Sequence, residues 1–160
     1  MKRKEVPEVK QRVVVSQCLL GVCCRYDGAC AANEAVCREA ARRGWIPVCP
    51  EILGGLTTPR PPAERREGQV VNCEGMDVTK AYARGAEEAL KIARIYGARY
   101  ALLKERSPSC GSGEIYDGTF SGKKRQGDGV TAELFRANGI RVYGESALGA
   151  LLECLEEEDQ

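Results

Sequence analysis

The sequence predicts a single-domain α/β fold in which a parallel sheet carries helices on both faces. Short, uniformly apolar runs typical of buried parallel strands alternate along the chain with segments of helical periodicity. The length of 160 residues is that of one domain. We divide the chain into a charged N-terminal segment (1–12), one domain (13–155) and an acidic tail (156–160).

The first half of the domain predicts two strands separated by a helix. Residues 13–15 are three consecutive valines and read as a buried strand. Residues 31–43 are rich in Ala, Glu and Arg and stop before a glycine, which predicts a helix. Residues 46–48 form a second short strand, which ends because Pro50 cannot extend a central ladder. The Gly-, Thr- and Pro-rich residues 54–62 then form a loop.

The middle of the chain contains the clearest helix. Residues 69–73 alternate weakly and predict an edge strand or hairpin. Asp77 and Thr79 are candidate caps of a helix whose apolar residues recur at helical spacing until Gly97. Residues 100–103 are a further apolar strand.

The C-terminal part completes the alternation of strands and helices. Residues 111–129 are rich in glycine and predict a long functional loop. They are followed by a helix over 131–138, a strand over 140–143 and a helix over 147–155. This order predicts a parallel sheet of Rossmann or flavodoxin type.

The chain contains nine cysteines and no histidine. An odd number of thiols favours metal binding or catalysis over disulfides. The absence of histidine excludes Cys–His nucleophilic pairs, Ser–His–Asp triads and zinc sites that need imidazole. The chemistry of this protein must therefore rest on Cys, Glu, Asp, Ser, Lys and Arg.

Charge and hydropathy indicate a small-molecule partner. The net charge is +1 with both signs interspersed, which argues against nucleic acid. No apolar run approaches the roughly 20 residues of a membrane span. Because residues 1–12 are charged and lack the apolar stretch of a secretory signal, we expect a cytoplasmic protein. A monomer is consistent with these features.

Cys18, Cys49 and Cys110 each follow a different predicted strand. In open parallel sheets, ligands bind outside the carboxyl ends of the strands, so these three thiols can converge there. Three thiolates without imidazole form a soft donor set that selects an iron–sulfur cluster or zinc. The alternative is that each thiol is a small buried apolar group.

The remaining cysteines fall into two groups. Three of them are assigned structural roles, two in predicted helices and one near the possible edge strand: Cys37, Cys154 and Cys73. Cys23, Cys24 and Cys30 remain open, and the first two lie close enough to Cys18 to compete with it as ligands.

Polar groups near these cysteines are candidates for acid–base chemistry and substrate binding. Glu51, two residues after Cys49, is the natural general base. Its alternative role is a surface carboxylate that caps a loop. Lys104, Ser107 and Ser109 precede Cys110 and supply hydrogen-bonding groups.

Three basic residues could meet an anionic group such as a nucleotide phosphate: Arg25, Arg60 and Lys123. A solvated surface role is expected for each of them taken singly.

Four strings carry a resemblance to a known family: SQCLLGVCCRYDG (16–28), VCPEILGGLTTPRPPAE (48–64), KERSPSCGSGEIYDGTFSG (104–122) and DGVTA (128–132). Together they resemble the thiouracil desulfidase family. The resemblance implies a 4Fe-4S cluster on Cys18, Cys49 and Cys110 with one iron left open. It also implies non-redox removal of sulfur from a thiolated pyrimidine or its nucleotide.

The same resemblance implies roles for the polar residues. Glu51 and Ser107 would be catalytic, with Glu51 as the base, and Lys104 and Ser109 would contact the pyrimidine. Two alternatives remain. One is a cluster- or zinc-binding sulfur sensor or carrier without turnover, and the other is a thiol-only oxidoreductase using Cys23 and Cys24. We rank the thiol-only oxidoreductase last, because adjacent cysteines form poor disulfides with each other.

Overall fold

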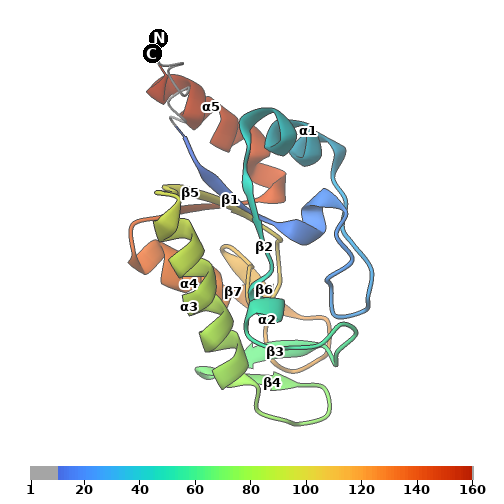
Figure 1. The fold of residues 1–160 in the computed structure, drawn as a ribbon. Coiled ribbons are helices and arrows are strands. Elements are labelled where there is room, and N and C mark those ends of the chain that lie inside the picture. The colour runs from blue at the N-terminus through green and yellow to red at the C-terminus, as the bar shows by residue number, and fades with distance from the viewer. Residues whose placement is uncertain (1–10, 160) are drawn as a thin grey trace.

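The computed structural model describes residues 11–159 and places four parallel strands in a central sheet (Figure 1). The strands are β1 (Val13–Ser16), β2 (Ile46–Val48), β5 (Tyr100–Leu103) and β8 (Arg141–Gly144). Their spatial order is β2-β1-β5-β8, with every neighbouring pair parallel. This is the order of the flavodoxin-like class, in which the chain direction across the sheet reverses beside β1. The predicted parallel α/β fold is confirmed.

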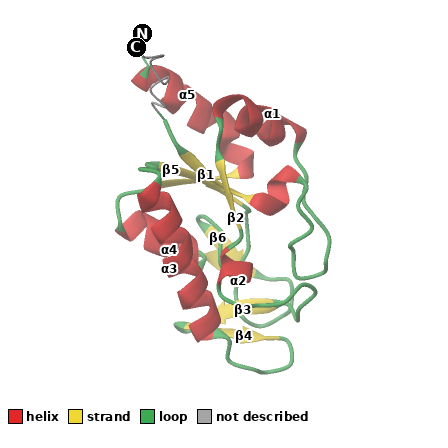
Figure 2. Cartoon of the chain, in the orientation of Figure 1, coloured by secondary structure: helices red, strands yellow, loops and turns green. Residues whose placement is uncertain are grey.

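Helices cover both faces of the sheet (Figure 2). The long helices are α1 (Glu34–Arg43), α3 (Thr79–Ile95), α4 (Val130–Ala137) and α5 (Leu148–Glu158). On one face Val14 packs in a core that contains residues of α3 and α4, whereas Val13 and Val15 pack in a second core with residues of α1 and α5. Because successive strand residues point to opposite faces, two-sided burial requires the continuous apolar run of β1. Between residues 11 and 159, no helix combines the length and hydropathy that a bilayer span needs.

The helix boundaries differ from the predicted ones at both ends of the domain. α1 begins at Glu34 rather than at residue 31, because the side-chain oxygen of Asn33 accepts a hydrogen bond from Val36 N (3.2 Å) and caps the helix there. α5 continues to Glu158, through most of the segment assigned to an acidic tail. Tyr100 OH donates to the Glu158 carboxylate, which ties this last turn to the sheet. Of the charged segment 1–12, residues 1–10 lie outside the described residues.

Two antiparallel hairpins extend beyond the carboxyl ends of the sheet (Figure 1). They are β3–β4 (Ala63–Arg66 and Gln69–Asn72) and β6–β7 (Glu114–Tyr116 and Lys124–Gln126). The first confirms the hairpin alternative for residues 69–73. The second lies within residues 111–129, so the prediction of one continuous loop there was wrong. All three residues of β7 are exposed, which leaves no apolar alternation to reveal a strand.

A short helix, α2 (Pro50–Leu53), follows Cys49 and packs closely against α3. A side chain at Gly85 would place its Cβ 1.9 Å from Pro50 O, and one at Gly54 would place its Cβ 2.1 Å from Ala81 O. Only glycine permits this approach. Two further one-turn helices are η1 (Gln17–Leu20) and η2 (Glu145–Ala147). The close contact between α2 and α3 positions the segment that contains Glu51.

Replacing Gly85 by alanine should therefore separate α2 from α3. We expect the free energy of unfolding to fall by about 1–3 kcal/mol, because the added methyl group collides with the backbone of α2. Gly149→Ala in α5 is the matched control, because a Cβ there meets nothing within 4 Å. That change should be neutral or should stabilise by about 0.5–1 kcal/mol. Urea unfolding of the two variants measures the difference, and equal stabilities would contradict this account.

Candidate metal centre

A cavity of about 410 Å³ opens at the carboxyl ends of the central strands. Its walls come from the segments that follow β1, β2 and β5, together with residues of β3 and of the β6–β7 connection. This is the position where open parallel sheets bind ligands. Four thiols line it: Cys18, Cys24, Cys49 and Cys110.

The three predicted thiols reach this cavity from three separate strands. Cys18 lies in η1, directly after β1, and is buried. Cys49 follows β2 and is the N-cap residue of α2. Cys110 is buried in the turn after β5, where Ser107 Oγ accepts hydrogen bonds from the backbone N–H groups of Ser109 and Cys110 (3.1 Å each). Strand ends and local turns thus bring together residues far apart in sequence.

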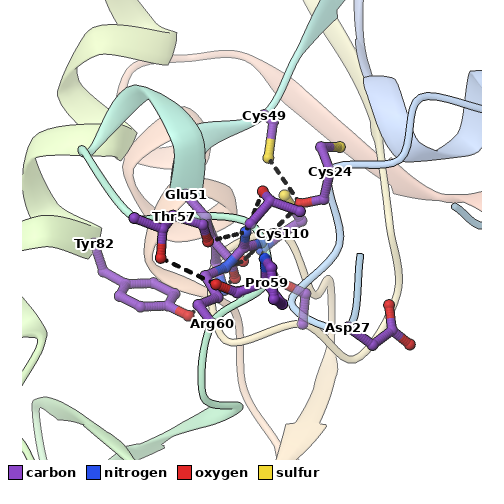
Figure 3. Close-up of polar contacts among 12 residues, drawn as sticks. Cys24, Asp27, Cys49, Glu51, Thr57, Pro59, Arg60, Tyr82 and Cys110 are labelled. Carbon is purple, nitrogen blue, oxygen red and sulfur yellow. Dashed lines mark hydrogen bonds and ion pairs between the residues drawn. The ribbon is translucent and has the colours of Figure 1, made fainter. Parts of the chain in front are cut away.

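Cys24 is a fourth thiol in the same cavity, and the sequence left its place open. It is buried, and its side chain contacts those of Cys18 and Cys49. Cys49 Sγ also donates a weak hydrogen bond to Cys24 O (4.0 Å; Figure 3). In contrast, Cys23 is exposed and Cys30 half-buried, and neither lines the cavity. The loop after η1, rather than any motif, decides which of these thiols turns inward.

Neighbouring thiols and burial raise the pKa values of three of these cysteines: Cys24, Cys49 and Cys110. The contact with the Cys24 thiol, followed by burial, raises the pKa of Cys49 far above its usual range. Burial raises the pKa of Cys110 to about 12. Metals bind the thiolate form, so loading of this site must displace protons from these side chains.

The chemistry of the side chains in this cavity fits an iron–sulfur cluster. Between residues 11 and 159, no group of three Cys, Asp or Glu side chains has the geometry to hold one metal ion. The thiols of Cys18, Cys24, Cys49 and Cys110 line the wall of one cavity. An iron–sulfur cluster bonds its protein thiolates through different irons, so its ligands stand farther apart than those of one ion. A soft set of thiols around a cavity fits such a cluster.

Glu51 lies in a buried hydrogen-bond network at the wall of this cavity (Figure 3). One carboxylate oxygen accepts from Arg60 Nε (2.8 Å) and Nη2, and the other accepts from Tyr82 OH (3.0 Å). Burial, together with the charge of Glu51, raises the pKa of Tyr82, which keeps its hydroxyl a donor. Arg60 and Tyr82 thus fix the orientation of the carboxylate from both sides. Glu51 is therefore not a surface carboxylate that caps a loop.

Arg60 was expected to have a solvated surface role, and this expectation was wrong. Its side chain is only 5% exposed. Besides pairing with Glu51, it donates to Cys24 O (2.9 Å) and to Thr57 O (3.1 Å). Arg60 thereby connects the carboxylate with the backbone of the segment that carries Cys24. The sequence contains no local signal for this burial, because the partners come from other segments.

Replacing Arg60 by methionine should leave the Glu51 carboxylate, which is 13% exposed, without its counter-charge. Loss of one partner of a buried pair costs about 3–5 kcal/mol in the free energy of unfolding. Arg42→Met is the control, since Arg42 pairs with Glu39 (2.9 Å) on the surface of α1 and is 66% exposed. That change should cost less than about 1 kcal/mol. If urea unfolding gave similar losses for both, the Arg60–Glu51 pair would not stabilise the fold.

Of the other three predicted polar residues, two line the cavity and one does not. Lys104 lines the cavity, and its ammonium group pairs with Glu145 Oε1 at 2.7 Å. Ser107 also lines the cavity. Ser109 does not: it is buried, and its hydroxyl hydrogen-bonds to Thr131 Oγ1 (2.8 Å) in α4. Because residues two apart in this turn face different sides, only one of the two serines flanking Pro108 reaches the cavity.

Comparison with known proteins identifies the relationship. A sequence profile of the 2-thiouracil desulfurase family matches residues 13–147. The chain belongs to this family. Its assignment to the desulfurases agrees with the motifs in the sequence. The family match includes all three strand-end cysteines.

Two similar proteins extend the comparison. The uncharacterized protein YbbK of Bacillus subtilis (strain 168) is 45% identical over 150 residues, which covers 88% of this desulfurase-family chain and 99% of the relative. A solved structure described as a 4Fe-4S-dependent thiouracil desulfidase, TudS, is 46% identical. It superposes with a TM-score of 0.88 and covers 92% of this chain and 99% of its own. Most of this chain therefore shares the architecture of that structure.

Proposed function

We propose that this protein is a 4Fe-4S-dependent desulfidase that converts a thiolated pyrimidine into the corresponding oxo-pyrimidine and sulfide. The substrate would be 2- or 4-thiouracil or its nucleotide. The observation that carries the proposal is the arrangement of Cys18, Cys49 and Cys110, which reach one cavity from three different strand ends. The TudS structure, described as a thiouracil desulfidase, supports the choice of substrate. A reducing, cytoplasmic setting suits nine unpaired thiols.

Cys18, Cys49 and Cys110 are the proposed cluster ligands. When bound through three thiolates, a 4Fe-4S cluster supplies an iron without a protein ligand, a soft Lewis acid suited to a thiocarbonyl sulfur. Cys24 lies against two of these ligands and makes a fourth thiol available in the same wall.

The overall reaction is a hydrolysis. Water supplies the oxygen that replaces sulfur at carbon, and sulfur leaves as sulfide, so carbon keeps its oxidation level and no reductant is consumed. Glu51 is the proposed base that takes a proton from the water. Each carboxylate oxygen has two lone pairs, so the bonds to Arg60 and Tyr82 leave acceptor capacity for a water in the cavity. Both partners orient the carboxylate, and Arg60 also balances its charge.

Ser107 and Lys104 are the proposed polar contacts of the pyrimidine. Ser107 Oγ accepts from two backbone N–H groups, which leaves its own hydrogen free to be donated to a substrate oxygen or nitrogen. The Lys104 ammonium has three donors, of which Glu145 and a backbone carbonyl of Glu105 (3.4 Å) take two. We assign Ser109 a supporting role in the turn that carries Cys110, because its hydroxyl is bound to Thr131.

Anaerobic reconstitution of the full chain tests this proposal. The protein should take up iron and acid-labile sulfide in the ratio of one 4Fe-4S cluster per chain, and release sulfide from at least one member of a panel of 2- and 4-thiopyrimidines and their nucleotides. Exposure to air should abolish both properties together. A cluster that forms without any sulfide release would favour the sulfur sensor or carrier. Sulfide release by metal-free protein would contradict the role of the cluster.

A further inference from the structure

Phe120, at the turn between β6 and β7, lines the cavity and has an unusual backbone conformation. Its φ angle is 55°, in the left-handed region that bulky residues rarely adopt. The residue as a whole is 37% exposed although it belongs to the wall of the cavity. Such conformations persist only where the surroundings enforce them, and they gather at sites that clamp ligands.

The surroundings that enforce this turn come from strand β3. A single oxygen of Glu64, Oε1, accepts hydrogen bonds from Gly118 N (3.0 Å) and Phe120 N (3.1 Å). Arg66 Nε donates to Gly118 O (2.9 Å). Gly118 lies so close to β3 that a Cβ there would stand 2.8 Å from Arg65 O. The first hairpin therefore holds the tip of the second, and with it Phe120, in one position.

Four aromatic side chains line the cavity, and Phe120 is the one without a hydroxyl group; the others are Tyr26, Tyr82 and Tyr116. The hydroxyl of Tyr82 is bound to Glu51. The Arg25 guanidinium lies over the ring of Tyr26, 5.8 Å from the ring centroid. Phe120 has no polar group to satisfy, and it lines the same cavity as the thiols and Glu51. A rigidly held aromatic ring in the wall of a cavity is a stacking surface for a flat heterocycle.

We propose that Phe120 stacks on the ring of the substrate and thereby sets the preference for aromatic thiopyrimidines over open-chain thiocarbonyl compounds such as thiourea. This assignment rests on the proposed function. It makes Phe120 a specificity-determining residue: it supplies affinity for the ring but takes no part in proton transfer or sulfur removal. Its effect should therefore fall on KM and not on kcat.

Substitutions at Phe120 test the proposal on the reconstituted enzyme and, independently, through calorimetric titration with uracil. Phe120→Ala should raise KM for 2-thiouracil and weaken uracil binding about tenfold or more, the range expected for loss of one stacked aromatic ring. Phe120→Tyr and Phe120→Trp should restore both values. Turnover of thiourea should be unchanged in all three variants. Ile95→Ala, which removes a large apolar side chain that is 77% exposed outside the cavity lining, is the control.

Glu64 provides a second test that leaves the ring in place. Glu64→Gln keeps an oxygen that can accept from both N–H groups and should preserve uracil affinity. Glu64→Ala removes it and should weaken binding of uracil in the same direction as Phe120→Ala.

Several results would overturn the inference. These are unchanged uracil affinity in Phe120→Ala, an effect on kcat instead of KM, an equal loss for thiourea, or no uracil binding by the wild-type protein. Failure of the proposed function is distinguishable, because it shows as absent sulfide release in the wild type while the uracil titration still reports on Phe120.

Discussion

Replacing Cys110 by alanine is expected to remove both the cluster and the sulfide-releasing activity of the reconstituted protein. Cys110 is one of three thiols in the proposed ligand set and is buried in the cavity wall. A cluster with only two protein ligands loses its anchorage. Iron and acid-labile sulfide content, measured together with sulfide release from 2-thiouracil, should fall to near background. Circular dichroism establishes that the variant is folded, and Cys110→Ser, which conserves side-chain volume, should give the same result.

Two further substitutions sharpen this test. Cys37→Ala in α1 removes a half-buried thiol outside the cavity lining, so iron content should stay at the wild-type level. Cys24→Ala removes the thiol that contacts Cys18 and Cys49 and should retain iron if the proposed three-cysteine set is complete. Loss of iron from Cys24→Ala combined with full retention by Cys110→Ala would transfer the third ligand to Cys24.

Glu51→Gln is expected to slow sulfide release by about 10²- to 10⁴-fold, the range found when a general base is removed. Glutamine has nearly the same shape and can still accept from Tyr82 OH, but it cannot take a proton from water. The three candidate ligands are unchanged, so the iron and sulfide content should equal that of the wild type. Steady-state rates with the reconstituted protein, normalised to iron content, measure the effect.

Glu39→Gln is the control for this substitution. Glu39 lies on α1, pairs with Arg42 and Arg43, and is outside the cavity lining. Its removal should leave the rate per cluster unchanged. Wild-type turnover by Glu51→Gln at normal iron content would show that another group activates the water. A loss of iron that parallels the loss of rate would instead make Glu51 a structural support of the cluster site.

The two central strands, β1 and β5, could be predicted because they are buried on both faces. Val13, Val14 and Val15 are fully buried, and strands of this kind must be apolar at every position. The positions of Cys18 and Cys49 followed, since each comes soon after a short strand that the sequence predicted. Exposed elements carry no comparable pattern. The β6–β7 hairpin and α2 are stabilised by contacts with β3 and α3, so their own residues did not reveal them.

The sequence by itself determined the parallel α/β architecture, the soft and histidine-free donor set, and the family to which the chain belongs. These features depend on local composition, strand periodicity and motif strings. Only the tertiary structure decided that Cys24 joins the cavity, that Arg60 is buried against Glu51, that Ser109 turns towards Thr131, and that Phe120 is held at the cavity wall. Each of these outcomes depends on contacts between segments distant along the chain. Such contacts form only when the sheet and its two hairpins assemble.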